Sequence, residues 1–190
     1  MPKPNVREKI VSSALHRFHR VGFHGTSIDD IVKQGEVPKG SFYNHFKSKE
    51  DLASEVLDRY VQSGPNDHLL RKDIAPLKRL KQYFKMLEKE LVASGYSKGC
   101  MLGNFSSELA DHSAPVRDKL KTYFSGWSAL IADVIKQAQE AEEIESKQKP
   151  EQLAGFLVSA WEGALLRVRA AKNDAALKEF YQIGFGELLK

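Results

Sequence analysis

Residues 22–52, GFHGTSIDDIVKQGEVPKGSFYNHFKSKEDL, decide the fold of this chain. The Thr–Ser pair near the start of this stretch can cap a short helix that ends at Gly35. Only two residues then precede Pro38, which suits the first turn of a second short helix over 38–45. Two short helices joined by a tight turn are typical of a helix-turn-helix, in which the second helix reads the major groove of DNA.

Amphipathic helices flank this stretch on both sides. Apolar residues recur at three- and four-residue spacing over 4–21, which predicts a helix that ends at Gly22. Ser48 can cap a further helix near 49–63, with two acidic residues in its first turn. The sequence therefore places the helix-turn-helix between two longer helices.

The second helix of the motif divides into an apolar and a polar side. Phe42 and Phe46 are four residues apart and are expected to pack inward. The side chains left toward solvent are Lys39, Ser41, Tyr43, Asn44 and His45. The lysine and the asparagine can donate to base edges, and the hydroxyl and imidazole groups can bond to phosphates. Gly40 has no side chain, so the backbone can approach DNA closely there.

Phosphate contacts are also expected at two helix N-termini. Lys49 opens the helix near 49–63, whose first N–H groups and positive dipole end suit an anion. The hydroxyl and amide groups of Thr26 and Ser27 offer the same at the start of the first short helix. These residues complete the candidate DNA-binding surface.

The basic charge of the chain is concentrated around this motif. The 190 residues carry 29 Lys and Arg against 25 Asp and Glu, a net charge of +4. Residues 1–49 hold nine of the basic and four of the acidic residues, a net charge of +5, so the rest of the chain carries −1. A basic segment on a near-neutral body is expected of a protein that binds nucleic acid, with a solvated charged surface as the alternative.

From the first helix through residue 52, the sequence closely resembles the TetR family of bacterial transcriptional repressors. The string over 22–52 is similar to the family signature nearly position by position. The resemblance implies an all-helical protein with an N-terminal DNA-binding domain and a second domain that senses a ligand and dimerises. It also implies repression of a promoter, relieved when a small molecule or chemical signal reaches the second domain. Carried over by position, it implies DNA contacts at Thr26, Lys39, Tyr43, His45 and Lys49.

The rest of the chain also has helical periodicity, and no alternating strand pattern occurs. Further helices are expected near 73–94, near 101–110, from Pro115, from Pro150 to about 170, and near 174–189, with a polar loop over 65–71. The predicted fold class is all-α, with about nine helices. We expect a helix-turn-helix DNA-binding domain over 1–48 and an effector-sensing and dimerisation domain over 49–190, connected by the helix near 49–63.

Two of these helices are expected to have apolar surface left over for a second copy of the chain. Residues 151–166 carry only two charged residues, so this helix is apolar nearly all round. Together with the last helix, near 174–189, it can form a four-helix interface in a homodimer. A two-fold dimer would read a near-palindrome whose half-sites lie about one DNA turn, roughly 34 Å, or more apart. The alternative is that both helices fill the core of one monomer.

Aromatic and apolar side chains of the second domain are candidates for an effector pocket. The candidates are Phe84, Leu87, Phe105, Tyr123, Trp127, Trp161 and Leu165. An aromatic stripe at helical spacing is, however, more often part of a core. Glu108 and Glu162 stand in otherwise apolar helices and can pair with a cationic ligand, with an internal partner or solvent as the alternative.

Cys100, the single cysteine, stands directly before the helix near 101–110. A helix N-terminus and the nearby Lys98 both favour the thiolate, which suits reaction with electrophiles or oxidants. The alternative is a small buried hydrophobic residue. The segment GCMLGNFSSELAD is similar to a branch of the TetR family that responds to reactive electrophiles, hypochlorite or small unsaturated compounds through a cysteine at this place. The resemblance therefore implies that Cys100 belongs to the effector site.

An enzyme is the main alternative from another function class. His16 and His19 lie three residues apart on a helix and can share a metal, but no carboxylate is placed as a third ligand. The pair Asp111 and His112 has no evident nucleophile, and no Gly-rich phosphate loop occurs. We therefore expect no catalytic residue, metal site or cofactor. A helical ligand-binding or interaction module without specific DNA binding is the remaining alternative.

Composition sets the compartment that we expect. One cysteine excludes an intrachain disulfide framework and fits a reducing environment. No apolar run approaches the roughly 18 residues that span a bilayer, and the first residues lack the apolar core of a signal peptide. These features predict a soluble, cytoplasmic protein.

Overall fold

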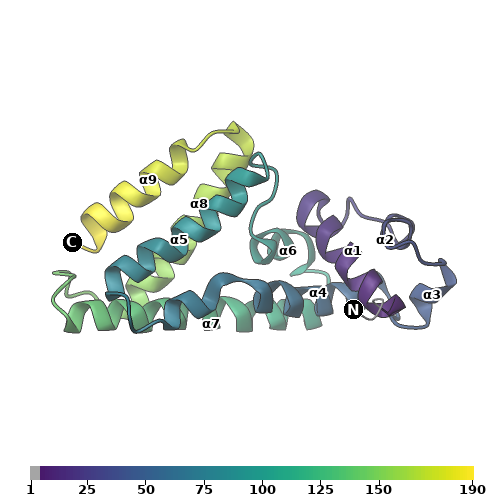
Figure 1. The fold of residues 1–190 in the computed structure, drawn as a ribbon, viewed down its shortest axis with the longest axis horizontal. Helices are drawn as coiled ribbons and strands as arrows, with labels where there is room; N and C mark the ends of the chain where they lie inside the picture. The colour runs from purple at the N-terminus through teal and green to yellow at the C-terminus, as the bar shows by residue number, and fades with distance from the viewer. Residues whose placement is uncertain (1–4) are drawn as a thin grey trace. The chain divides into compact units, whose positions relative to one another are not determined.

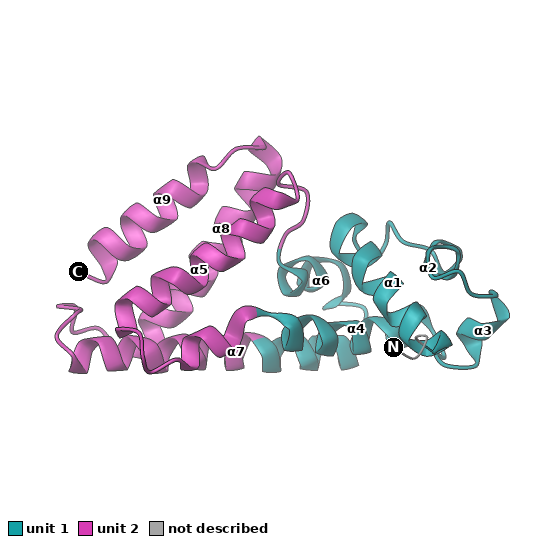
Figure 2. Cartoon of the chain, in the orientation of Figure 1, with its two compact units in different colours: residues 1–64, 100–123 teal, residues 65–99, 124–190 magenta. Residues whose placement is uncertain are grey.

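The computed structural model describes residues 5–190, and these residues form α-helices, two short turns of other helical types and no strand (Figure 1). They divide into two compact units (Figure 2). Unit 1 comprises residues up to 64 together with 100–123, and unit 2 comprises 65–99 and 124–190. The predicted all-α fold class is confirmed.

Unit 1 contains the helix-turn-helix and the helices that support it. Its elements are α1 (Val6–Val21), α2 (Ile28–Gln34), α3 (Gly40–Tyr43), α4 (Lys49–Ser63), α6 (Met101–Leu109) and the first part of α7 (Ala114–Glu140). The predicted start of the first helix, at residue 4, lies outside the described residues. The structure gives α3 fewer residues than the predicted range 38–45, because its α-helical hydrogen bonding spans only four residues.

Side-chain caps fix where these helices begin. Asn5 accepts a hydrogen bond from the backbone N–H of Glu8 at 2.8 Å and so caps α1. At α2, Ser27 Oγ accepts from the N–H of Asp30 at 3.1 Å, while the Asp30 carboxylate accepts from the N–H of Ser27 at 3.0 Å. Ser48 caps α4 through the N–H of Asp51 at 3.2 Å. The caps predicted at the Thr–Ser pair and at Ser48 are thus present, with Ser27 in the N-cap position.

An aromatic cluster joins α6 to α1 within unit 1. The ring centroid of Phe18, on α1, lies 5.5 Å from that of Phe23 and 5.7 Å from that of Phe105, on α6. Phe18 and Phe105 are fully buried, and Phe23 is 2% exposed. Burying an aromatic side chain of this size stabilises a fold by about 1.5–3 kcal/mol, so α6 is held firmly against the helix before the helix-turn-helix.

Ion pairs join α4 to its neighbours in the same unit. Arg59 on α4 donates to both carboxylate oxygens of Glu8 on α1, at 2.5 and 2.9 Å. Lys119, in the first part of α7, donates to both carboxylate oxygens of Asp58 at 2.6 and 2.7 Å and to the carbonyl of Ser54 at 3.0 Å. The residues of α4 therefore pack with α1 and with the first part of α7, in the same unit as the helix-turn-helix, although the sequence predicts a domain boundary at 48. That functional boundary stays a prediction.

Unit 2 is built around a second aromatic cluster. Its elements are a 3₁₀ turn (Pro65–Leu70), α5 (Pro76–Ala93), the rest of α7, α8 (Pro150–Ala171), α9 (Ala175–Ile183) and a π-helical turn (Gly184–Leu188). The ring of Phe84 on α5 lies 5.1 Å from Trp161 on α8 and 5.0 Å from Phe180 on α9. These rings are at most 6% exposed and form the core of the unit.

The structure differs from the sequence-based expectation at two places in unit 2. Residues 65–70 form a 3₁₀ turn where we expected an irregular loop, and Leu69 within this turn is buried. The last helix is α-helical only through Ile183, and the next residues form a π-helical turn that contains two glycines. Within residues 5–190, no helix is both long and apolar enough to cross a membrane.

Candidate DNA-binding surface

The helix-turn-helix presents a polar surface because its aromatic residues point inward. Phe42 is fully buried and Phe46 is 3% exposed, as the four-residue spacing predicted. The remaining side chains of this segment face solvent: Lys39, Tyr43, Asn44 and His45 are exposed and Ser41 is half-buried. Tyr43 is 60% exposed, which is unusual for a large aromatic side chain and leaves its hydroxyl available to a partner.

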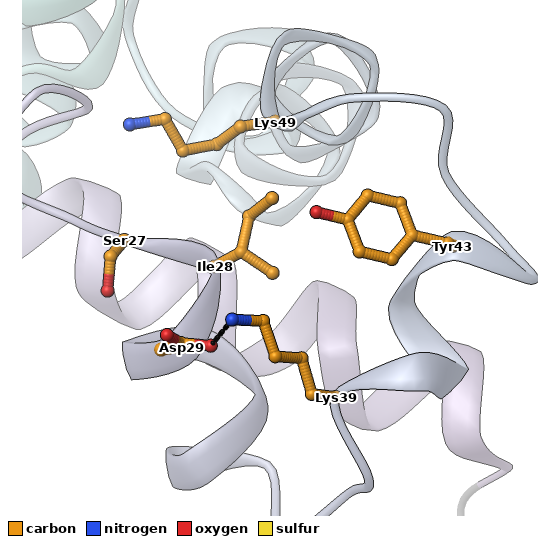
Figure 3. Close-up of a pocket in the computed structure, with 6 residues that line it drawn as sticks. All are labelled: Ser27, Ile28, Asp29, Lys39, Tyr43 and Lys49. Carbon is orange, nitrogen blue, oxygen red and sulfur yellow. Dashed lines mark ion pairs between the residues drawn. The ribbon is translucent and has the colours of Figure 1, made fainter.

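Side chains from three helices line an open pocket on this surface (Figure 3). The pocket has a volume of about 310 Å³ and is lined by Ser27, Ile28, Asp29, Lys39, Tyr43 and Lys49. Four of these residues were predicted from sequence to contact DNA. The structure therefore brings together the start of α2, the α3 segment and the first residue of α4.

Lys39 and Asp29 form an ion pair across this pocket. Lys39 Nζ lies 2.7 Å from Asp29 Oδ1, and the two side chains are 61% and 65% exposed (Figure 3). The hydrogen bond to the carboxylate raises the pKa of Lys39, so this side chain carries its charge throughout the physiological range. Lys39 was expected to donate to base edges, and Asp29 is a partner that the sequence analysis did not predict.

Lys49 has its ammonium group turned toward the turn that precedes α2. Lys49 Nζ donates to the carbonyls of Phe23 at 2.9 Å and Thr26 at 2.8 Å, and it lies 4.1 Å from the centroid of the Phe23 ring. Burial lowers the pKa of Lys49. The predicted phosphate contact stays a prediction, and in the structure the same ammonium stabilises the 22–26 turn.

The 22–26 turn is also held by α6. Glu108 accepts a hydrogen bond from the N–H of His24 at 2.8 Å, and its backbone carbonyl lies 3.1 Å from His24 Nε2. Gly22 has φ +87°, and a Cβ at this position would lie 2.7 Å from Glu108 Oε1. Thr26 is 1% exposed and donates to the carbonyl of Gly22 at 2.8 Å, so its hydroxyl is occupied within the turn.

Sequence reasoning placed Glu108 in an effector pocket and missed this contact. The two residues are 84 positions apart, and no local pattern links residues at such a distance. A single glutamate in the apolar segment 101–110 was the available signal, and it indicated only that some internal partner was needed.

The other candidate pocket residues divide between the two units. Cys100, Phe105, Glu108 and Tyr123 belong to unit 1, whereas Phe84, Leu87, Trp127, Trp161 and Leu165 belong to unit 2. In unit 2, all except the half-buried Leu87 are at most 8% exposed. Trp127 Nε1 is buried and has no hydrogen-bond acceptor within the described residues, which leaves one donor for a partner. The membership of an effector pocket stays a prediction for all nine residues.

Two of the unit 1 candidates have defined surroundings. Cys100 is half-buried and occupies the N-cap position of α6 without a side-chain hydrogen bond to the cap. The Tyr123 hydroxyl donates to the Asp58 carboxylate, and burial, with that neighbouring carboxylate, raises the pKa of Tyr123 to about 12. Tyr123 thus belongs to the α4–α7 ion-pair cluster. The described residues contain no group of three or more His, Cys, Asp or Glu side chains placed to hold a metal ion.

Comparison with known proteins agrees with this geometry. The family model described as bacterial regulatory proteins, tetR family, matches residues 10–56, and the model described as tetracyclin repressor-like, C-terminal domain, matches residues 76–183. The chain is 35% identical over 192 residues to the HTH-type transcriptional repressor DhaR of Mycobacterium sp. (strain GP1), a match that covers 100% of this chain and 95% of that protein.

Solved structures share the same fold. The regulatory protein TetR from Rhodobacter sphaeroides has a TM-score of 0.87 and 27% identity, covering 94% of this chain and 96% of that one. The reduced form of E. coli NemR has a TM-score of 0.86 and covers 95% of each chain, and at 24% identity this likeness concerns the fold alone.

Proposed function

Because the chain belongs to the TetR family of bacterial regulatory proteins, and is therefore a DNA-binding regulator rather than an enzyme, we propose that it represses transcription. In this proposal a homodimer binds a near-palindromic operator and leaves it when an effector acts on the C-terminal part. The observation that carries the proposal is the exposed polar side of the α3 segment, where Lys39 and Tyr43 are about 60% exposed within a segment of net charge +5. A regulator of this kind acts on the chromosome, so we assign it to the cytoplasm.

Each residue of this surface has a proposed role. The α3 segment enters the major groove, where Lys39 and Asn44 donate to base edges beside the backbone of Gly40. Phosphates on either side are bound by the polar groups that flank this segment. These are Thr26, Ser27, Ser41, Tyr43, His45 and Lys49. Thr26 would have to give up a bond for this role, since its hydroxyl donates to the carbonyl of Gly22 and its backbone N–H donates to the carbonyl of Phe23.

DNA binding can be tested with the sequence upstream of the chain's own gene. Fluorescence anisotropy should show a salt-sensitive complex that a scrambled duplex of equal length does not compete away. Lys49→Gln should weaken binding to all sequences, whereas Lys39→Gln should also change the preferred sequence. Equal affinity for the upstream and scrambled duplexes would contradict operator recognition and favour a helical ligand-binding protein.

The homodimer is supported by an exposed apolar stripe on α8. Phe156 is 54% and Leu166 62% exposed, and Ser159 and Gly163 lie between them on the same side of the helix. Ile183 at the end of α9 is 52% exposed. We propose that these helices form the four-helix interface with a second copy, since exposed apolar stripes of this kind mark contacts between proteins.

A charge placed in the stripe tests this interface. Leu166→Glu should convert the dimer to a monomer in sedimentation equilibrium, because an unpaired carboxylate would be buried at the interface. Leu70→Glu is the matched control, since Leu70 is 59% exposed and lies on the 3₁₀ turn. If Leu166→Glu sediments with the same mass as the wild type and as Leu70→Glu, the proposed interface is wrong.

For the effector, we propose that an electrophile reacts with Cys100. The thiolate sulfur adds to the β-carbon of an activated alkene, the C=C bond becomes a single bond, and a proton from solvent adds to the neighbouring carbon. Cys100 occupies the N-cap position of the nine-residue helix α6, whose other end carries the contact of Glu108 with His24. A change at the cap would therefore act on the helix that holds the 22–26 turn. A small molecule bound among the apolar residues of unit 2 is the alternative effector.

A thiol-specific reagent separates these alternatives. N-ethylmaleimide should release wild-type protein from operator DNA, and Cys100→Ser should remain bound. Mass spectrometry should find one adduct on the wild type, since the chain has one cysteine. Release of Cys100→Ser to the same extent would contradict sensing through this residue.

A further inference from the structure

The ion pair between Asp29 and Lys39 lies at the part of the helix-turn-helix that faces bases. Lys39 occupies the N-cap position of α3, and the N-terminal residues of a recognition helix contact base edges. Asp29 comes from α2, and its carboxylate lies 2.7 Å from the ammonium that would read the base (Figure 3). A negative charge at this point repels phosphates, so its presence on a basic surface needs a reason.

Helix capping does not supply that reason. The capping box of α2 is made by Ser27 and Asp30, whose side chains satisfy each other's backbone N–H groups. Asp29 takes no part in these bonds and points to Lys39 instead (Figure 3). An exposed ion pair contributes only about 0–1 kcal/mol to folding and a carboxylate in the first turn of a helix about 0.3–1 kcal/mol, so stability is at most a small part of the role of Asp29.

The pair matches the major-groove edge of a G·C base pair. Guanine offers two acceptors, O6 and N7, and its partner cytosine offers one donor, the N4 amino group. O6 and N4 are hydrogen-bonded to each other and so lie about 2.9 Å apart, close to the separation of the ion pair. Lysine is a preferred ligand of guanine O6 and N7, and aspartate is a preferred acceptor for cytosine N4.

From this match, and resting on the proposed operator binding, we infer that Asp29 and Lys39 together read one G·C base pair in each half-site. The ammonium has three donors and the carboxylate has about four acceptor sites, so both can bind the base pair while still bonded to each other. Because the pair is already formed in the free protein, little side-chain entropy is lost on binding. An A·T pair fits less well: when its adenine N6 donor faces the carboxylate, the ammonium meets thymine O4 alone, beside the C5-methyl group, rather than the two acceptors of guanine.

The inference predicts that two variants on different helices relax the same base pair. Wild type, Asp29→Ala and Lys39→Ala are each used to select duplexes from a random-sequence library. The wild-type consensus should contain a G·C pair in each half-site, preferred about tenfold over the other base pairs, as expected for one good base contact. In both variants this preference should fall to within about twofold. Glu50→Ala is the matched control, because it removes an exposed carboxylate from the first turn of α4 and should leave the consensus unchanged.

A modified base tests the carboxylate contact without altering the protein. N4-methylcytosine at the selected position puts a methyl group where the donor should be, so it should weaken wild-type binding about as much as Asp29→Ala does. The same modification should not further weaken the binding of DNA by Asp29→Ala. Affinity of Asp29→Ala for mixed-sequence DNA should rise, since a negative charge has been removed.

Other outcomes would contradict either the reading of the G·C pair or the proposed operator binding. If the two variants relax different positions, or the shared position is an A·T pair, the inference is wrong. If Asp29→Ala tightens binding to selected and mixed-sequence DNA by the same factor, Asp29 only repels phosphates. If the wild type enriches no sequence at all, the proposed operator binding itself fails, whereas an enriched consensus without the shared G·C pair overturns this inference alone.

Discussion

Replacing Lys49 with methionine should loosen the turn that leads into the helix-turn-helix. Methionine keeps most of the apolar stem of Lys49 but removes the ammonium that bonds to the carbonyls of Phe23 and Thr26 at 2.9 and 2.8 Å. A hydrogen bond to a charged group contributes about 1.5–3 kcal/mol when it is well buried. Lys49 is half-buried, so water can replace part of this, and we expect a total loss of about 2 kcal/mol.

The assay is chemical denaturation followed by circular dichroism, with thermal melting as a second measure. A loss of about 2 kcal/mol corresponds to a fall in the melting temperature of about 4–8 °C for a chain of this length. Lys47→Met is the control, since this lysine is exposed, and it should change the free energy of unfolding by less than about 0.5 kcal/mol. Equal unfolding free energies for Lys49→Met and the wild type would refute the anchoring role.

Three further predictions concern the same unit. Gly22→Ala should lower the free energy of unfolding by at least about 1 kcal/mol, because φ is +87° and the new Cβ would lie 2.7 Å from Glu108 Oε1; unchanged urea unfolding would contradict this. Gly40→Ala should fold at least as stably as the wild type, since no atom lies within 4 Å of the new Cβ. It should nevertheless weaken DNA binding in an anisotropy titration, because the added methyl group would meet DNA. Full affinity would show that the backbone does not approach DNA at this position. The hydrogen bonds from Arg59 hold the pKa of Glu8 below its ordinary value of 4.5, so the stability that this pair provides should be lost as pH falls below 4.5, and the urea midpoint of Glu8→Gln should show less dependence on pH in that range than that of the wild type.

The sequence predicts the features of this fold that depend on neighbouring residues. The glycine after α1 ends that helix, and two serines cap α2 and α4. Each of these residues acts on neighbours within a few positions of the chain, so the sequence pattern predicts them. The inward direction of Phe42 and Phe46 follows from helical spacing in the same way. Local periodicity therefore predicts the helix-turn-helix and the types of residue on its surface.

Contacts between distant segments could not be predicted in this way. Glu108 was assigned to an effector pocket because no pattern shows that it meets His24, 84 residues earlier in the chain. Lys39 was expected to be available for bases, and its partner Asp29 is fixed by how α2 and α3 pack rather than by spacing. The 3₁₀ turn over Pro65–Leu70 was missed because its polar composition resembles that of a loop.

The central claim is that the basic helix-turn-helix of this chain recognises a particular DNA sequence. The most direct test is a titration of the wild-type protein against its own upstream DNA and a scrambled duplex of the same composition, over a range of salt concentrations. We predict that the protein binds the upstream duplex at least about a thousandfold more tightly than the scrambled duplex at physiological salt. For both duplexes, the logarithm of the binding constant should fall linearly with the logarithm of the salt concentration. Equal affinity for the two duplexes at every salt concentration would contradict the claim.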